Sequence, residues 1–186
     1  VPGDDADLAP ELAVGRAPVT TVNQASCFID KVIDYEAAGP DAQWTNRGLF
    51  LAEVLFPSDW EPGVPISLDG ALYAGEIIDT SFEPCTDMAP TRMYEAHMNW
   101  EGAVPLTLAA TIDSLDTGHF GIVNQMGHGH YFNMSVGDAN FRTNHAAALT
   151  NGNSFLIYAL NCASGAYDFA CLMERFLQNC DGGSIC

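Results

Sequence analysis

Basic residues are scarce in this chain of 186 residues. Six lysines and arginines stand against 24 aspartates and glutamates, which gives a formal net charge of -18 at pH 7. Binding to nucleic acid or to an anionic membrane requires clustered Lys and Arg that neutralise phosphates. The composition therefore argues against both classes of partner and favours a self-repelling surface.

Long apolar runs are also missing. No run in the sequence approaches the roughly 20 residues that a membrane-spanning helix requires. No charged segment followed by an apolar one opens the chain, so we expect that any secretion signal has already been removed. The hydrophobic content of 48% is nevertheless ample for a buried core, and the length fits one ordinary domain.

The six cysteines include no CxxC pair, which makes a zinc ribbon a weak interpretation. Apart from Cys162, discussed below, they are Cys27, Cys85, Cys171, Cys180 and Cys186. We predict one or two disulfides among these five, an exported protein, and at least one thiol that is free or paired outside this chain. The alternative is that all are reduced core cysteines of a cytosolic protein.

Neither histidines nor aspartates form a recognisable metal site. His128, His130 and His145 lack the HExxH type of spacing and an obvious general-base glutamate, so we predict no zinc. The acidic cluster of Asp4, Asp5 and Asp7 lacks the glycine-punctuated loop of a calcium site and is better explained as a solvated turn. We expect no metal and no cofactor.

Apolar runs alternate with helical periodicities along the chain, which predicts an α/β domain with a mostly parallel sheet. An acidic lead-in segment, residues 1–14, precedes a domain that covers residues 15–186. We expect helices at residues 21–36, 67–78, 107–116, 143–150 and 167–177. We expect strands at residues 48–56, at 91–97 on the sheet edge, at 154–161, and in the run that ends at His128.

Two of these strands end in residues that do chemistry, His128 and Cys162. Side chains at the carboxyl ends of neighbouring parallel strands converge on one crevice. A thiol is a useful nucleophile only as its thiolate, and a nearby imidazole can take its proton. The segment between the two residues is long enough for a crossover that contains the predicted helix at 143–150. The alternative is a plain core cysteine at a strand end.

Glycines flank His128 on both sides, at positions 127 and 129. A glycine lets a substrate carbonyl approach the backbone closely. The amides of Gly129 and Cys162 could therefore bind an oxyanion together, and each such donor is typically worth about 3 kcal/mol in the transition state.

Several motifs resemble those of the gingipain-type cysteine peptidases, which belong to the caspase-like clan. They are VNQMGHGH, a helix ending in ALTNG, the strand SFLIYALNC, the continuation SGAYDFACLMERFL, and the amino-terminal ELAVGRAPVTTVNQASCFIDKVIDYE. The resemblance covers roughly Glu11 to Ile185, with residues 57–103 poorly matched.

The resemblance implies a caspase-like three-layer sandwich and assigns roles to particular residues. His128 would be the general base and acid, Cys162 the nucleophile, and Gly129 an oxyanion donor. An acidic residue after the first strand supports the catalytic histidine in this family, and Glu53 is the nearest candidate. Arginine-specific members place an aspartate at the base of the S1 pocket, where Asp69 is the candidate. The alternative for both acids is a solvated surface carboxylate.

The function implied is that of a secreted bacterial cysteine endopeptidase. It would cleave polypeptide substrates through an acyl-enzyme thioester, with a preference for a basic P1 residue. The alternative is a non-catalytic binding or assembly module on the same scaffold. Family members have further strands after the catalytic cysteine, so either a second chain completes the sheet or this sequence is part of a longer one.

Overall fold

The computed structural model describes residues 15–39, 42–85 and 88–186. The predicted lead-in segment at residues 1–14, including the three aspartates considered for calcium, lies outside the described residues. No helix in the described ranges is both long enough and apolar enough to cross a membrane.

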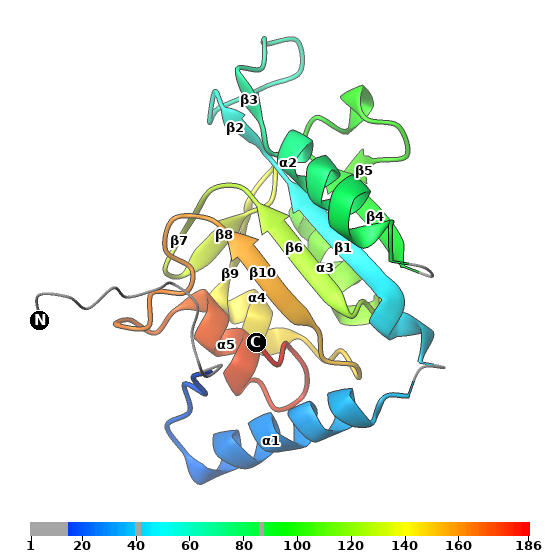
Figure 1. Ribbon diagram of the computed structural model, residues 1–186. Helices are drawn as coiled ribbons and strands as arrows, with labels where there is room; N and C mark the ends of the chain where they lie inside the picture. The colour runs from blue at the N-terminus through cyan, green and yellow to red at the C-terminus, as the bar shows by residue number, and fades with distance from the viewer. Residues whose placement is uncertain (1–14, 40–41, 86–87) are drawn as a thin grey trace, which may run out of the picture.

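Five parallel strands form the central sheet (Figure 1). In chain order they are β1 (Arg47–Ala52), β4 (Ala89–Tyr94), β5 (Val104–Pro105), β6 (Ile122–Met126) and β10 (Leu156–Leu160), and their spatial order is β10-β6-β1-β4-β5. The expected parallel α/β sheet is therefore confirmed. The expected position of β4 at the sheet edge was wrong, because the short β5 pairs with its last two residues.

Helices cover both faces of the sheet, which confirms the three-layer sandwich (Figure 1). Alternate residues of β1 point to opposite faces. Leu49 and Leu51 pack with α3 (Leu108–Thr117), α4 (Thr143–Ala148) and α5 (Leu172–Gln178). Phe50 and Ala52 pack with α2 (Gly70–Ile77) and the π-helical turn Ile78–Phe82 that extends it.

The first helix, α1 (Val22–Ala37), lies against α5 rather than on the sheet (Figure 1). Its predicted start is confirmed, because the Thr21 side chain caps it by accepting a hydrogen bond from the Gln24 amide. Of its apolar residues Phe28 and Val32 are half-buried, whereas Ile29 and Ile33 are exposed. The buried residue of α1 is Lys31.

The structure departs from two predicted elements, the strand that was expected to contain Glu53 and the helix that was expected to contain Asp69. The expected strand at 48–56 is interrupted at Glu53, whose carboxylate turns inward to bind backbone amides, and it resumes as β2 (Val54–Phe56). β2 pairs antiparallel with β3 (Leu68–Asp69), so the expected helix at 67–78 begins only at Gly70. Short 3₁₀ turns occupy Gln43–Asn46 and His97–Asn99.

The segment after His128 is more regular than the loop expected there. It forms a small antiparallel sheet of β7 (Gly129–His130), β8 (Asn133–Ser135) and β9 (Asn140–Arg142). The expected helix at 167–177 starts only at Leu172, because the Leu172 amide binds the Tyr131 carbonyl and Phe169 stacks on the Tyr131 ring. The aromatic residues before Leu172 thus pack on this segment instead of forming a helical turn.

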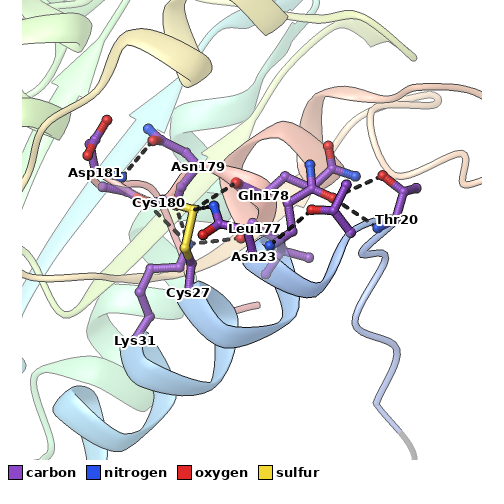
Figure 2. Close-up of a disulfide and its surroundings, with 12 residues drawn as sticks. Thr20, Asn23, Cys27, Lys31, Leu177, Gln178, Asn179, Cys180 and Asp181 are labelled. Atoms are coloured by element: carbon purple, nitrogen blue, oxygen red, sulfur yellow. Dashed lines mark hydrogen bonds between the residues drawn. A yellow bond between two sulfur atoms is a disulfide. The ribbon is translucent and has the colours of Figure 1, made fainter.

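One disulfide joins Cys27 of α1 to Cys180, which follows α5 (Figure 2). One or two disulfides were expected, and this bond confirms the lower number within the described residues. Cys85, Cys162 and Cys186 are exposed free thiols, and Cys171 is a buried one.

Candidate active site

Four chemically distinctive residues follow the carboxyl ends of four neighbouring strands. Glu53 follows β1, Glu95 follows β4, His128 follows β6, and Cys162 follows β10. In the pairing of β6 with β10, Met126 lies opposite Leu160, so His128 and Cys162 each stand two residues beyond a paired position. Parallel strands end at the same edge of a sheet, and ligands bind in the crevice there.

The imidazole of His128 is held by a backbone carbonyl. Its Nε2 lies 3.1 Å from the carbonyl oxygen of Leu55, in β2. Because a carbonyl can only accept a hydrogen bond, Nε2 carries a proton in this contact, and Nδ1 holds the lone pair of the neutral ring. The ring of Phe56 meets the imidazole edge-on, with 6.4 Å between centroids. One nitrogen of His128 is thus left to accept a proton.

Glu53 binds the backbone around His128 and not its ring. Its carboxylate is 3% exposed and accepts hydrogen bonds from the amides of His128 and Gly137, both at 2.9 Å. A Cβ at Gly127 would collide with this carboxylate, which explains the first glycine of the GHG triplet. Glu53 is therefore a buried, fully engaged acid and not a solvated one.

Asn161 anchors the turn that carries Cys162. Its side-chain oxygen accepts a hydrogen bond from the Ser164 amide at 3.2 Å, and its Nδ2 donates to the side chain of buried Gln125 at 2.8 Å. A Cβ at Gly129 would lie 2.7 Å from Asn161 Cγ. The Gly129 backbone therefore packs directly on the residue that precedes Cys162, and Cys162 itself is exposed.

Asp69 is a buried cap for α2. One carboxylate oxygen accepts a hydrogen bond from the Ala71 amide at 3.0 Å, and the other accepts one from Trp100 Nε1 at 3.1 Å. The amide of Gly70 binds the Glu53 carbonyl, so Asp69 lies beside the chain that carries Glu53. Asp69 is 7% exposed, which excludes a solvated surface role for it.

Glu95 is a site residue that sequence reasoning missed. Its Oε2 accepts a hydrogen bond from the Val54 amide at 2.8 Å, next to the Leu55 carbonyl that binds His128. Burial raises the pKa of Glu95, the carboxylates of Glu53 and Asp69 act in the same direction, and the Val54 amide and His128 oppose them. The sequence did contain a signal for Glu95, because it directly follows a strand, as Glu53 does.

No group of three potential metal-ligating side chains occurs among the residues the structure describes. Of the histidines considered for zinc, His145 accepts a hydrogen bond from the Arg142 amide at the start of α4. His130 packs against the rings of Tyr131 and Phe132. Neither shares a contact with His128.

The profile of peptidase family C25 matches residues 2–186. The chain belongs to this family. No curated protein sequence matches it.

Solved structures show the same fold. The chain is similar to the crystal structure of the Arg-specific cysteine proteinase gingipain R (RgpB), with a TM-score of 0.65 and 20% identity over 87% of this chain and 35% of that one. It is also similar to the complex of Porphyromonas gingivalis RgpB pro- and mature domains, with a TM-score of 0.62 and 19% identity over 86% of this chain and 36% of that one. This C25 chain thus spans about a third of the length of the structures it matches.

Proposed function

We propose that this protein is a cysteine endopeptidase in which Cys162 is the nucleophile and His128 the general base and acid. The observation that carries the proposal is the register of β6 and β10, which sets both residues just beyond paired strand ends in a chain of a peptidase family. The contact of the Gly129 backbone with Asn161 brings the two loops together.

The hydrogen bond from His128 Nε2 to Leu55 leaves Nδ1 free to take the thiol proton of Cys162. The thiolate attacks the scissile carbonyl, and the amine leaves with the proton from Nδ1 as the C–N bond breaks. Water then attacks the thioester carbonyl as Nδ1 accepts its proton, the C–S bond breaks to release the carboxylic product, and the sulfur takes the proton back from Nδ1. The Gly129 and Cys162 amides bind the oxyanion formed at each step, worth about 3 kcal/mol per donor.

The acidic residues near His128 support a preference for a basic P1 side chain. The carboxylate of Asp69 lies close enough to Glu95 to raise the pKa of Glu95, and His128 lies close enough to oppose this rise. Because both oxygens of Asp69 already accept hydrogen bonds, its role would be to supply negative charge at the pocket rather than a new hydrogen bond. A structure similar to this chain is described as Arg-specific.

A peptide library that varies P1 tests activity and specificity together. We expect cleavage after Arg and Lys, and no cleavage by Cys162→Ala. Cleavage that depends on Cys162 but shows another P1 preference would overturn the specificity and leave the peptidase assignment intact. Absence of cleavage by the native protein at every P1 would favour the non-catalytic binding module instead.

We further propose that additional polypeptide completes the sheet beside β10. Residues 184–186 run parallel to the start of this strand, with Ile185 donating to the Phe155 carbonyl and Ile157 donating to the Cys186 carbonyl. Beyond that point Tyr158 and Leu160 are exposed. An uncovered strand edge is prone to pairing with other chains. Intact-mass analysis of the native protein distinguishes the occupants: a longer chain, a co-purifying second fragment, or a single 19.9 kDa species that would refute completion.

The Cys27–Cys180 bond supports export to an oxidising compartment, since disulfides persist mainly in extracellular and periplasmic proteins. We therefore propose secretion from a bacterial cell. Recovery of the oxidised protein from the medium of the source organism tests this, and detection only in the reducing cytosol would contradict it.

A further inference from the structure

Lys31 is the only lysine in the chain, and it is buried. It lies in α1, one helical turn after Cys27, and its side chain reaches under the end of α5 (Figure 2). Its ammonium nitrogen lies between 2.9 and 3.2 Å from five backbone carbonyl oxygens, those of Phe176, Leu177, Asn179, Gly182 and Ser184. We call these five groups the carbonyl cage.

The carbonyl cage has the chemistry of a cation site. Phe176 and Leu177 belong to the last turn of α5, where carbonyls lack helical partners and the helix dipole is negative. An ammonium has only three protons for the five oxygens, so the five oxygens cannot each receive a separate hydrogen bond. The carbonyl dipoles therefore surround the positive charge as they would surround a spherical ion. Among the described residues the only ion pair joins Arg92 to Glu83, so no carboxylate there neutralises Lys31.

The dimensions of the cage select the kind of cation. Calcium binds oxygen at about 2.3–2.6 Å and usually recruits carboxylates. The distances of 2.9–3.2 Å in the cage are longer, and every ligand atom is a carbonyl oxygen. Rings of backbone carbonyls bind K⁺ in place of its hydration shell. The cage is therefore matched to a large monovalent cation.

The cage also determines where the end of the chain runs. Gly183 adopts a φ of +87°, and the Ser184 amide donates to the Phe176 carbonyl, so the chain turns back sharply after α5. Ser184 then forms a parallel bridge with Phe155, directly before β10. Five carbonyls from both sides of this turn meet at one nitrogen, which ties the turn to α1.

We propose that the carbonyl cage is a monovalent-cation site whose built-in occupant is the ammonium of Lys31, and that K⁺ occupies it when this side chain is removed. Its role is to hold residues 182–186 against the start of β10. Burial lowers the pKa of Lys31 to about 8, so the group remains mostly charged at neutral pH. A surface pocket of about 160 Å³ is lined by Lys31, Asn151 and Gly182 among others, so it adjoins the cage.

Thermal unfolding of Lys31→Ala and Lys31→Met in equal concentrations of KCl and choline chloride tests the site. We expect both variants to unfold at lower temperature than the native protein in choline. KCl should restore at least half of the loss in Lys31→Ala, whose cage is vacant, and none in Lys31→Met, whose side chain fills it. The control is Cys27→Ser/Cys180→Ser, which retains Lys31 and should unfold equally in both salts. Equal unfolding of Lys31→Ala in the two salts, or native stability of Lys31→Met, would overturn the proposal.

A measurement on the native protein covers the case in which the variants do not fold. Since Lys31 is the sole lysine, ¹⁵N-lysine labelling gives one ammonium signal. The Lys31 ammonium of the folded protein should exchange its protons with water at least tenfold more slowly than the same ammonium does when the protein is unfolded in urea at the same pH. Exchange at the unfolded rate would refute the cage.

Discussion

The carboxylate of Glu53 accepts a hydrogen bond from the backbone amide of His128 at 2.9 Å, while the imidazole of His128 binds the carbonyl of Leu55 at 3.1 Å. The two contacts position different parts of His128. Glu53 fixes the path of the loop that carries His128, and Leu55 fixes the orientation and tautomer of the ring. The acid nearest to the proposed catalytic histidine thus acts here through the main chain.

Replacing Glu53 with Gln should damage this arrangement. A glutamine has one acceptor oxygen where the carboxylate presents two to the amides of His128 and Gly137. One buried N–H would then face an NH₂ group, which costs about 1–3 kcal/mol. We expect a lower free energy of unfolding in urea and a lower kcat for peptide cleavage. Glu61→Gln, at an exposed position, is the matched control and should change neither.

Gly129→Ala tests the contact between the two loops that carry the proposed catalytic residues. The added Cβ would lie 2.7 Å from Asn161 Cγ, and overpacking of this kind costs about 1–3 kcal/mol. We expect kcat/KM to fall about 10- to 100-fold, since each 1.36 kcal/mol is a factor of ten. In Asn161→Ala/Gly129→Ala the contacts with Asn161 Cγ and Oδ1 are removed and only the contact with Cβ at 3.0 Å remains, so the double variant should be more active than the product of the single effects. Strict multiplicativity would show that the contact does not couple the loops.

Glu95 should make stability depend on pH. Burial raises its pKa above the ordinary value of 4.5, so the folded protein holds this proton more tightly than the unfolded chain does. Its contribution to stability is therefore greatest below pH 4.5 and declines as pH rises from there through the folded pKa. Thermal unfolding of native protein and Glu95→Gln from pH 4 to 8 measures this. The native protein should lose stability relative to the variant as pH rises, and a constant difference would contradict the prediction.

The disulfide should contribute strongly to stability because Cys27 and Cys180 are 153 residues apart. Closing a loop of this length stabilises a protein by up to about 5 kcal/mol in the chain-entropy account, with 2–5 typical for native bonds. Dithiothreitol should therefore lower the unfolding temperature of the native protein. Cys85→Ser, which removes an exposed free thiol, should respond to the reductant as the native protein does. Cys27→Ser/Cys180→Ser should not respond at all.

Much of the sheet could be predicted because its strands are continuous apolar runs and its helices carry local start signals. Thr21 caps α1 as its sequence pattern indicates, and Thr107, at the predicted start of the helix at 107–116, caps α3. The placement of His128 and Cys162 just beyond the ends of neighbouring strands followed from the topology of parallel strands. The apolar runs and the helix start signals depend on residues close together in the chain.

The features that were missed depend on partners distant in sequence. Glu95 accepts a hydrogen bond from the Val54 amide, which is 41 residues away, and no local sequence pattern predicts this bond. The burial of Lys31 depends on carbonyls at least 145 residues away, which overrides the apolar periodicity of Ile29 and Ile33. Asn161 owes its position to Gln125 on the neighbouring strand.

The rate at which Cys162 reacts with iodoacetamide tests the central claim most directly. An activated thiolate beside His128 should react at least tenfold faster than the exposed Cys85 and Cys186 of the same molecule. His128→Ala should abolish this advantage, whereas His130→Ala, at an exposed neighbouring position, should preserve it. If Cys162 reacts no faster than the same thiol in denatured protein, or if His128→Ala leaves its rate unchanged, the catalytic pair proposed for this site is wrong.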